Sequence, residues 1–267
     1  MYHIIVLAGQ SNAVGQGTGA FIDPFYTEEV DARIKQVGRV PGTNRKIIDV
    51  GNVVNGVKWD GLHHWRKDPT DATIGFGLPF ARRYVSQGYL SEGDQVLIIP
   101  GAWGGSSILR WTDRIIPGGS TLTIHEDLVS RVNIGLATEG SSVKAILWAQ
   151  GETDMISAST NEDGMSSVFY KQKLKQYVHM LRRDVSATAP IVMTLPLPSW
   201  TPGCLDAKWA IENAIKSVAH STGCAVASTS SPTDLQPNSA SDPHINAASQ
   251  IELAQRYFAK WLVLTGL

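Results

Sequence analysis

The feature that most constrains the fold is a set of five short apolar runs that alternate with helical patterns. Each run is almost continuously hydrophobic, rich in β-branched residues and bounded by turn formers, which is typical of strands buried on both faces. The expected strands are His3–Ala8, Gln95–Pro100, Val143–Ala149, Ile191–Leu195 and Ala225–Ser228. The expected helices are Phe76–Gln87, His125–Glu139, Val168–Val185, Asp206–Ser221 and Ala247–Leu264. This alternation predicts an α/β fold with a mainly parallel five-stranded sheet between two layers of helices.

Residues 21–70 interrupt the alternation and are expected to form a loop-rich insertion after the first strand. Within it, Arg33–Val40 and Lys46–Val50 are expected to pair as a small β-ribbon. The sequence contains no internal repeat, low-complexity tract or linker. We therefore predict a single domain over residues 1–267, with one insertion. In the third helix, the apolar stripe from Val168 to Val185 is expected to face the sheet.

The charge balance argues against binding to polyanions. The chain has 23 Lys and Arg against 24 Asp and Glu, a formal charge of −1, so neither nucleic acid nor an anionic membrane is an expected partner. No apolar run approaches the roughly 20 residues of a membrane helix. The N-terminus lacks a basic region and leads straight into Gln10 and Ser11, so it does not resemble a signal peptide. We expect a cytoplasmic protein or a component of a phage virion tail.

Two cysteines, Cys204 and Cys224, are too few for a disulfide framework and lack the spacing of metal ligands. We expect them to be two small buried side chains. Whether they form a disulfide with each other stays open at this point.

Open parallel sheets bind ligands beyond the carboxyl ends of their strands, so the segments that follow the strands are the first place to look for a site. Four segments at expected strand ends, or just before the last helix, carry polar or glycine-rich sequences. They are Gly9-Gln10-Ser11-Asn12, Gly104-Gly105-Ser106-Ser107-Ile108, Gln150-Gly151-Glu152-Thr153-Asp154 and Asp242-Pro243-His244. Taken singly, Ser11 also fits a helix N-cap and the paired glycines also fit a tight turn.

A nucleotide site is a weaker interpretation of the first segment. The run from Gly15 to Ala20 loosely fits a dinucleotide-binding fingerprint. However, its glycines begin several residues past the strand, Pro24 follows soon after, and no second strand with a terminal acid lies at the expected distance. A phosphate-binding loop with Gly-Lys-Ser/Thr is also absent from this sequence.

Together, the four segments hold the groups that serine hydrolysis needs. A serine hydroxyl such as that of Ser11 is a weak nucleophile until a neighbouring base takes its proton. Among the seven histidines, only His244 lies both late in the chain and beside an acid, and Asp242 would orient its imidazole. Stabilisation of the oxyanion needs donors, for which the N–H groups of Ser11 and Gly105 and the amide of Gln150 are candidates.

These segments, with Trp111 and Trp148, resemble the sequence blocks of SGNH hydrolases, and most closely the carbohydrate esterases of the sialate O-acetylesterase and acetyl xylan esterase type. The blocks run from residue 9 to residue 244, so the resemblance covers nearly the whole chain. It implies a flavodoxin-like α/β/α fold and the removal of O-acetyl groups from sugars without a metal or other cofactor. It also implies Ser11 as nucleophile, Asp242 and His244 as its triad partners, and Gly105 and Gln150 in the oxyanion hole.

Two departures from the superfamily pattern matter. Many members have Asp-x-x-His, whereas this chain has Asp-x-His, a spacing associated with the sialate esterase-like branch. The usual asparagine of the third block is absent, and Gln150 is its expected substitute. Glu152 is a candidate accessory acid for positioning His244; the alternative interpretation is a structural carboxylate that binds the loop.

The expected substrate is an acetylated carbohydrate such as sialic acid, xylan or another glycan. Asn12, Trp103 and Trp111 are candidate substrate-binding residues, since aromatic faces stack on sugar rings, although core packing is the alternative for each tryptophan. Two other functions stay open: a non-catalytic glycan-binding or structural module of a phage or bacterial surface assembly, and a lipid esterase or thioesterase of the same fold. The sequence does not indicate an oligomeric state.

Overall fold

A seven-stranded sheet in the order β3-β2-β4-β1-β5-β6-β7 forms the centre of the structure. The computed structural model describes residues 1–18, 31–38, 44–49, 74–113, 122–161, 164–201 and 203–267. The strands are β1 Tyr2–Gly9, β2 Ile34–Val37, β3 Ile47–Asp49, β4 Gln95–Pro100, β5 Ser142–Ala149, β6 Ile191–Thr194 and β7 Ala225–Ala227. Neighbouring strands run parallel, except that β3 is antiparallel to β2. All five predicted strands are present, and the predicted α/β class is confirmed.

The sheet has two strands more than we predicted, because the ribbon of the insertion joins it. The predicted pairing of this ribbon is confirmed, with Val37 opposite Ile47 in the antiparallel register. On its other side β2 runs parallel to β4, with Ile34 opposite Val96. The short-range pattern predicts the hairpin but carries no information about this long-range pairing.

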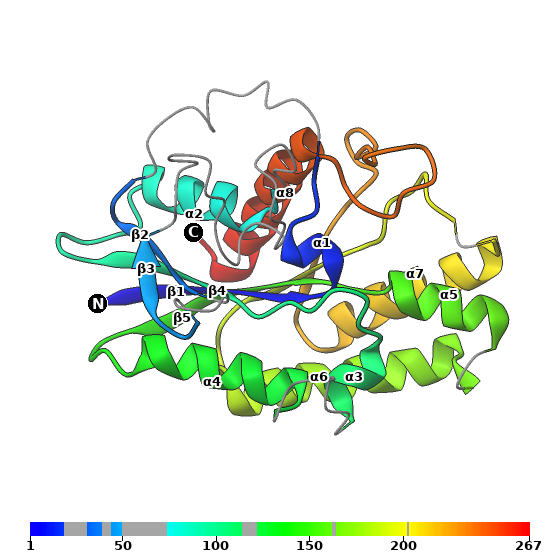
Figure 1. Cartoon of the computed structure of the whole chain (residues 1–267), viewed down its shortest axis with the longest axis horizontal. Coiled ribbons are helices and arrows are strands. Elements are labelled where there is room, and N and C mark those ends of the chain that lie inside the picture. Colours follow the sequence, from blue (N-terminus) through cyan, green and yellow to red (C-terminus); the bar gives the residue numbers. More distant parts are fainter. Residues whose placement is uncertain (19–30, 39–43, 50–73, 114–121, 162–163, 202) are drawn as a thin grey trace.

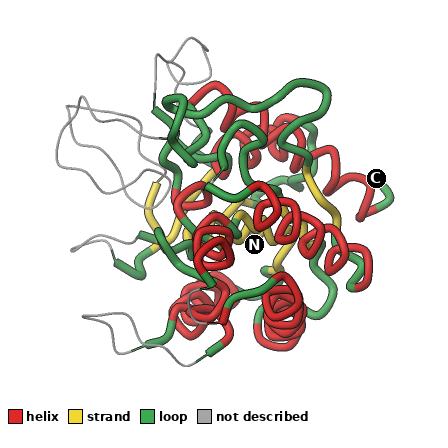
Figure 2. Tube along the Cα trace, turned by 90° about the vertical axis from the view of Figure 1, so that its right-hand side faces the viewer, coloured by secondary structure: helices red, strands yellow, loops and turns green. Residues whose placement is uncertain are grey.

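The helices form two layers around the sheet (Figure 1). They are α1 Ser11–Val14, α2 Gly77–Ser86, α3 Ile108–Thr112, α4 Ile124–Leu136, α5 Glu152–Thr160, α6 Ser167–Asp184, α7 Leu205–Ser221 and α8 Ala247–Thr265. Helices α2 and α8 pack together on one face, and α4, α6 and α7 lie on the other (Figure 1). Figure 2 shows the molecule turned by 90°, with helices on both sides of the strands. No helix in the described part of the chain is long and apolar enough to cross a membrane.

One predicted core position is wrong. Val168 is 65% exposed, whereas Tyr170, Leu174 and Leu181 of the same helix are buried. Val168 lies two residues before Tyr170, about 200° around the helix axis, and therefore on the opposite face. Both cysteines are free thiols; Cys224 is buried as expected, but Cys204 is only partly buried.

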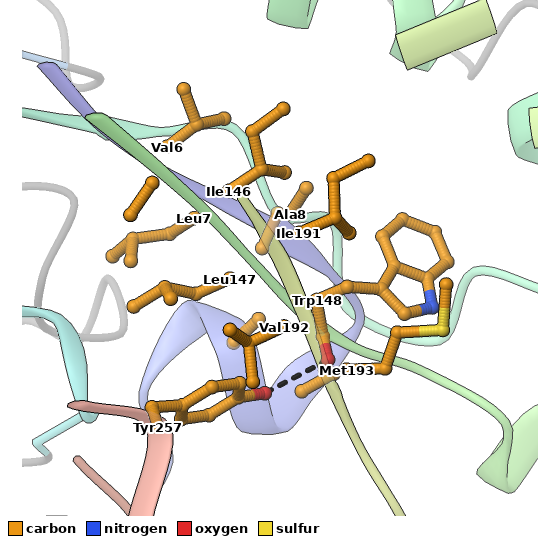
Figure 3. Packing of buried hydrophobic residues seen from close by; sticks show 14 of the residues in the cluster. Val6, Leu7, Ala8, Ile146, Leu147, Trp148, Ile191, Val192, Met193 and Tyr257 are labelled. Atoms are coloured by element: carbon orange, nitrogen blue, oxygen red, sulfur yellow. Dashed lines mark hydrogen bonds between the residues drawn. The ribbon is translucent and has the colours of Figure 1, made fainter. Parts of the chain in front are cut away.

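The centre of the sheet is buried on both faces, as the continuous apolar runs predicted. Figure 3 shows side chains of β1, β5 and β6 packed in layers, with Tyr257 of α8 donating its hydroxyl to the carbonyl of Trp148 at 2.8 Å. Such packing fixes the carboxyl ends of β1, β4 and β5 relative to one another. Helices α1, α3 and α5 start just beyond these three strand ends, so their first residues lie along one edge of the sheet (Figure 1).

Candidate active site

Ser11 is the first residue of α1, two residues beyond β1. The turn depends on Gly9, whose φ is +120° and where an added Cβ would lie 2.0 Å from the carbonyl oxygen of Ala149. The next residue, Gln10, donates its N–H to that same oxygen at 2.8 Å. The serine is therefore carried on a tight turn attached to the end of β5.

Neither the hydroxyl nor the N–H of Ser11 has a hydrogen-bond partner among the residues that the structure describes. The residue is 7% exposed, and its hydroxyl forms no hydrogen bond with any residue that the structure describes. Its N–H stands in the first turn of α1, where backbone donors have no acceptor inside the helix. Ser11 thus offers a hydroxyl and an N–H side by side.

His244 and Asp242, which the sequence analysis named as base and orienting acid, are in direct contact. The Nδ1 atom of His244 lies 2.6 Å from Oδ1 of Asp242, and the His244 N–H donates to the same oxygen at 2.9 Å. Each side chain is about one-quarter exposed. With Nδ1 bound to the carboxylate, Nε2 is the imidazole nitrogen left to exchange a proton with a third group.

Asn12 connects the turn of Ser11 to the loop of His244. Its Nδ2 donates to the carbonyl of Pro243 at 3.1 Å, and its Oδ1 accepts the N–H of Ile245 at 2.9 Å. The residue after the serine therefore binds both chain neighbours of the histidine, and this brings two sequence blocks more than 200 residues apart to one place. Asn12 is 1% exposed with its amide fully used, so the expected substrate contact does not fit this arrangement.

Glu152 is the first residue of α5 and is 4% exposed. Its Oε1 accepts the amide of Asn12 at 2.7 Å, while Oε2 is buried without a partner among the described residues. Burial raises the pKa of Glu152, and the Asn12 amide and the charge of His244 oppose that shift. No hydrogen bond links Glu152 directly to His244 within the described structure.

Gly105 lies in an exposed turn between β4 and α3 and has a φ of +66°. Within the described structure its N–H has no acceptor. Two hydrogen bonds of the next residue stabilise the turn. The Ser106 hydroxyl donates to the carbonyl of Trp103 at 2.7 Å and accepts the indole N–H of Trp111 at 2.9 Å. An oxyanion hole requires N–H donors that are held in place and not already bonded, and the Gly105 N–H in this turn meets both conditions within the described structure.

Gln150 points into the protein. Its amide nitrogen donates to Asp154 and, at 3.2 Å, to the carbonyl of Ser106, while its Oε1 accepts the hydroxyl of Tyr170 at 3.0 Å. The residue is 1% exposed, and both of its amide protons already have acceptors. This arrangement does not support the expected oxyanion contact and instead gives Gln150 a role in bracing the Gly105 turn.

Asp154 is a residue to which sequence analysis gave no role. Its two carboxylate oxygens accept the N–H of Ile108 at 3.1 and 3.0 Å, at the start of α3, and it is fully buried. Burial raises its pKa to about 7, against the pull of Gln150 and Ile108. The only signal in the sequence was an acid four residues after Gln150, a spacing that one helical turn brings together.

Asp154 should make stability depend on pH. The pKa of Asp154 is 3.8 in the unfolded chain and about 7 in the folded chain. Between these pH values the folded chain therefore binds a proton on Asp154 that the unfolded chain has released. Stability is therefore expected to fall by about 2–3 kcal/mol from pH 5 to pH 8. Urea unfolding at both pH values measures the change. Asp154→Asn, which is neutral throughout, should show a clearly smaller decrease; equal decreases would contradict the assignment.

Trp103 and Trp111, the two tryptophans expected to bind substrate, differ in burial. Trp111 is 1% exposed, and its ring contacts Trp148 and Tyr177 at centroid distances of 5.1 and 5.2 Å, so it is a core residue without a face for substrate. Trp103 is partly buried and beside the Gly105 turn, and its N–H donates to the carbonyl of Gly9 at 2.9 Å. Trp59 and Trp65 of the insertion, whose rings could also stack on a sugar, and Arg114, which could meet the carboxylate of an acidic sugar, lie outside the described residues.

The described part of the chain contains no group of three His, Cys, Asp or Glu residues placed to hold a metal ion. The segments beyond β1 and β4 and the loop before α8 carry a serine hydroxyl, an acid-bound imidazole and two backbone N–H groups that have no acceptor among the described residues. These are the chemical groups that serine-dependent acyl transfer uses: a nucleophile, a base with its orienting acid, and N–H donors for an oxyanion.

Comparison with known proteins identifies the class. Residues 1–263 match the family of carbohydrate esterases described as sialic acid-specific acetylesterases, and the chain belongs to this family. A probable 9-O-acetyl-N-acetylneuraminic acid deacetylase of Escherichia coli is 24% identical over 78% of this chain and 68% of its own. A probable carbohydrate esterase of Arabidopsis thaliana is 26% identical over 71% of this chain and 66% of its own.

Solved structures share the fold over nearly the full length. The crystal structure of NanS has a TM-score of 0.66 at 19% identity and covers 99% of this chain and 98% of its own. A carbohydrate acetylesterase from Xanthomonas citri has a TM-score of 0.65 at 16% identity, covering 99% of this chain and 57% of its own. The predicted SGNH-type fold and the predicted carbohydrate O-deacetylation by a carboxylic ester hydrolase are thereby confirmed, and the non-catalytic and lipid-esterase alternatives are not favoured.

Proposed function

We propose that the chain removes an acetyl group from a sugar hydroxyl by way of an acyl-enzyme on Ser11, with His244 as general base and Asp242 as its orienting acid. The observation that carries this proposal is the 2.6 Å contact between His244 and Asp242, in a loop that Asn12, the residue after Ser11, binds on both sides of the histidine. A nucleophile, a base and an orienting carboxylate in this order form the arrangement that activates serine.

The reaction has two steps. First, Nε2 of His244 takes the Ser11 proton as Oγ attacks the acetyl carbonyl carbon, and the same proton then goes to the departing sugar oxygen as the ester C–O bond breaks. Second, His244 takes a proton from water as the water oxygen attacks the acyl carbon. That proton then goes to Oγ of Ser11 as the Oγ–C bond breaks, which releases acetic acid, ionised to acetate at neutral pH, and free Ser11. Each step passes through a tetrahedral oxyanion, for which the N–H groups of Ser11 and Gly105 are the proposed donors.

The proposed substrate class is an O-acetylated sugar, and acetylated sialic acid is the first member to test. Support comes from the sialic acid-specific family and from the relative in Escherichia coli that is named as a 9-O-acetyl-N-acetylneuraminic acid deacetylase. The Asp242 and His244 side chains are polar and about one-quarter exposed, which suits a hydroxylated substrate better than a long acyl chain.

The test measures hydrolysis of p-nitrophenyl acetate and of p-nitrophenyl octanoate by the purified chain, followed by acetate release from 9-O-acetyl-N-acetylneuraminic acid and from acetylated xylo-oligosaccharides. A fluorophosphonate, which labels activated serines, identifies the nucleophile by peptide mass spectrometry. We expect p-nitrophenyl acetate to be hydrolysed at least tenfold faster than p-nitrophenyl octanoate. We expect the fluorophosphonate label to be on Ser11. A folded chain that cleaves neither ester and takes no label would overturn the proposal.

A further inference from the structure

Two asparagine side chains fasten the loop that carries His244, and they do so at different places. Asn12 binds the loop at Pro243 and Ile245, the two residues that flank the histidine. Asn238 lies within the loop and binds residues 16 and 18: its Nδ2 donates to the carbonyl of Gln16 at 2.9 Å, and its Oδ1 accepts the N–H of Thr18 at 2.8 Å. Each side chain thus makes two bonds to backbone, but only Asn12 makes them next to the base.

Glu152 fixes the orientation of the Asn12 amide. A carboxylate accepts hydrogen bonds, so only the NH₂ end of Asn12 can face Oε1 of Glu152, 2.7 Å away. With that end defined, the same NH₂ group faces the Pro243 carbonyl and the oxygen faces the Ile245 N–H. An inverted amide would oppose like groups at all three contacts. Glu152 therefore acts on the histidine loop indirectly, through its hydrogen bond to Asn12.

We propose that Asn12 is a positioning residue that sets the location of His244 relative to Ser11, and that Glu152 influences the base only by orienting Asn12. This inference rests on the proposed function, in which Ser11 and His244 exchange a proton. It assigns a role to the residue that directly follows the nucleophile, and it gives the buried carboxylate of Glu152 a task other than a second bond to the imidazole.

The physical basis is the sensitivity of proton transfer to distance. Moving a reacting group by about 1 Å can cost 10²-fold in rate without weakening substrate binding. Asn12→Ala removes both bonds that flank His244, so we expect kcat for p-nitrophenyl acetate to fall by about 10²-fold with KM changed by less than threefold. Labelling of Ser11 by the fluorophosphonate should slow by a similar factor.

Asn238→Ala is the matched control, because it also deletes one amide and two backbone bonds from the same loop. We expect this variant to keep kcat within threefold of the wild type. If Asn12→Ala and Asn238→Ala lower kcat equally, general loosening of the loop explains the result and the positioning role is wrong. Should Asn12→Ala not fold by circular dichroism, Asn12→Ser is measured against the same criteria.

A double-mutant cycle tests the part assigned to Glu152. Glu152→Leu removes the acceptor for the Asn12 amide, and we expect it to lower kcat by tenfold or more. If Glu152 acts only through Asn12, the double variant Asn12→Ala/Glu152→Leu should be no slower than the slower single variant. Effects that multiply would mean that Glu152 acts on His244 independently, and would overturn this part of the proposal.

The failure of this inference and the failure of the proposed function have different signatures. If the wild type neither hydrolyses p-nitrophenyl acetate nor takes a label on Ser11, the proposed function itself fails. If the wild type is active and labelled while Asn12→Ala retains full kcat, the esterase mechanism stands and the positioning role of Asn12 is wrong.

Discussion

Replacing Ser11 with alanine is expected to lower kcat for p-nitrophenyl acetate by at least about 10⁴-fold, because removal of a triad nucleophile leaves only the oxyanion donors and substrate binding. The N–H of residue 11 remains in the variant, so the residual rate reports what the backbone donors supply. Steady-state hydrolysis at high enzyme concentration, corrected for the uncatalysed rate, measures the loss. A variant that keeps wild-type kcat would show that Ser11 is not the nucleophile.

The same substitution should leave stability nearly unchanged, since the Ser11 hydroxyl has no hydrogen-bond partner among the described residues. Ser166→Ala provides the opposite control. Ser166 is the N-cap of α6, and its hydroxyl accepts the N–H of Phe169 at 3.2 Å. Loss of this hydroxyl should lower the free energy of unfolding by about 1 kcal/mol and leave kcat unchanged. Urea unfolding of both variants separates a chemical effect from a folding effect.

The layers of the fold were predictable because they depend on local patterns. Continuous apolar runs revealed strands such as His3–Ala8, and the 3.6-residue period revealed the long helices. Helix α5 was missed, because Glu152–Thr160 is mostly polar and has no clear apolar stripe. The pairing of β2 with β4 was missed because it joins residues some 60 positions apart, which no local pattern records.

The site was predictable up to the identity of its blocks but not up to the direction of its side chains. The rule that ligands bind at strand ends led to Ser11 and Gly105, and the acid–x–histidine spacing led to the 2.6 Å pair. For Gln150 and Asn12 the sequence suggested exposed roles, yet both are buried in hydrogen-bond networks. Apart from Asp154, which is four residues after Gln150, the partners described above lie 20 to 233 residues away, and no local pattern in the sequence records them.

The two acids near His244 should differ sharply when each is made neutral. Oδ1 of Asp242 accepts from both Nδ1 and the backbone N–H of His244, whereas Glu152 contacts Asn12 and not the imidazole. In Asp242→Asn, an amide oxygen at the Oδ1 position can still accept both N–H groups of His244, but the side chain no longer carries a negative charge. The imidazolium that forms when His244 takes the Ser11 proton is then left without a carboxylate to stabilise it.

We therefore expect Asp242→Asn to lower kcat by at least about 10²-fold. Glu152→Gln should lower kcat by less than tenfold, because a glutamine oxygen still accepts the Asn12 amide. Both variants are made in the full chain, checked for folding by near-ultraviolet circular dichroism, and assayed on p-nitrophenyl acetate across pH 5–9. The reverse ranking in folded variants would make Glu152 the acid that orients the base. A large loss in both would mean that the two carboxylates act on His244 together, and that the path through Asn12 is only part of the effect of Glu152.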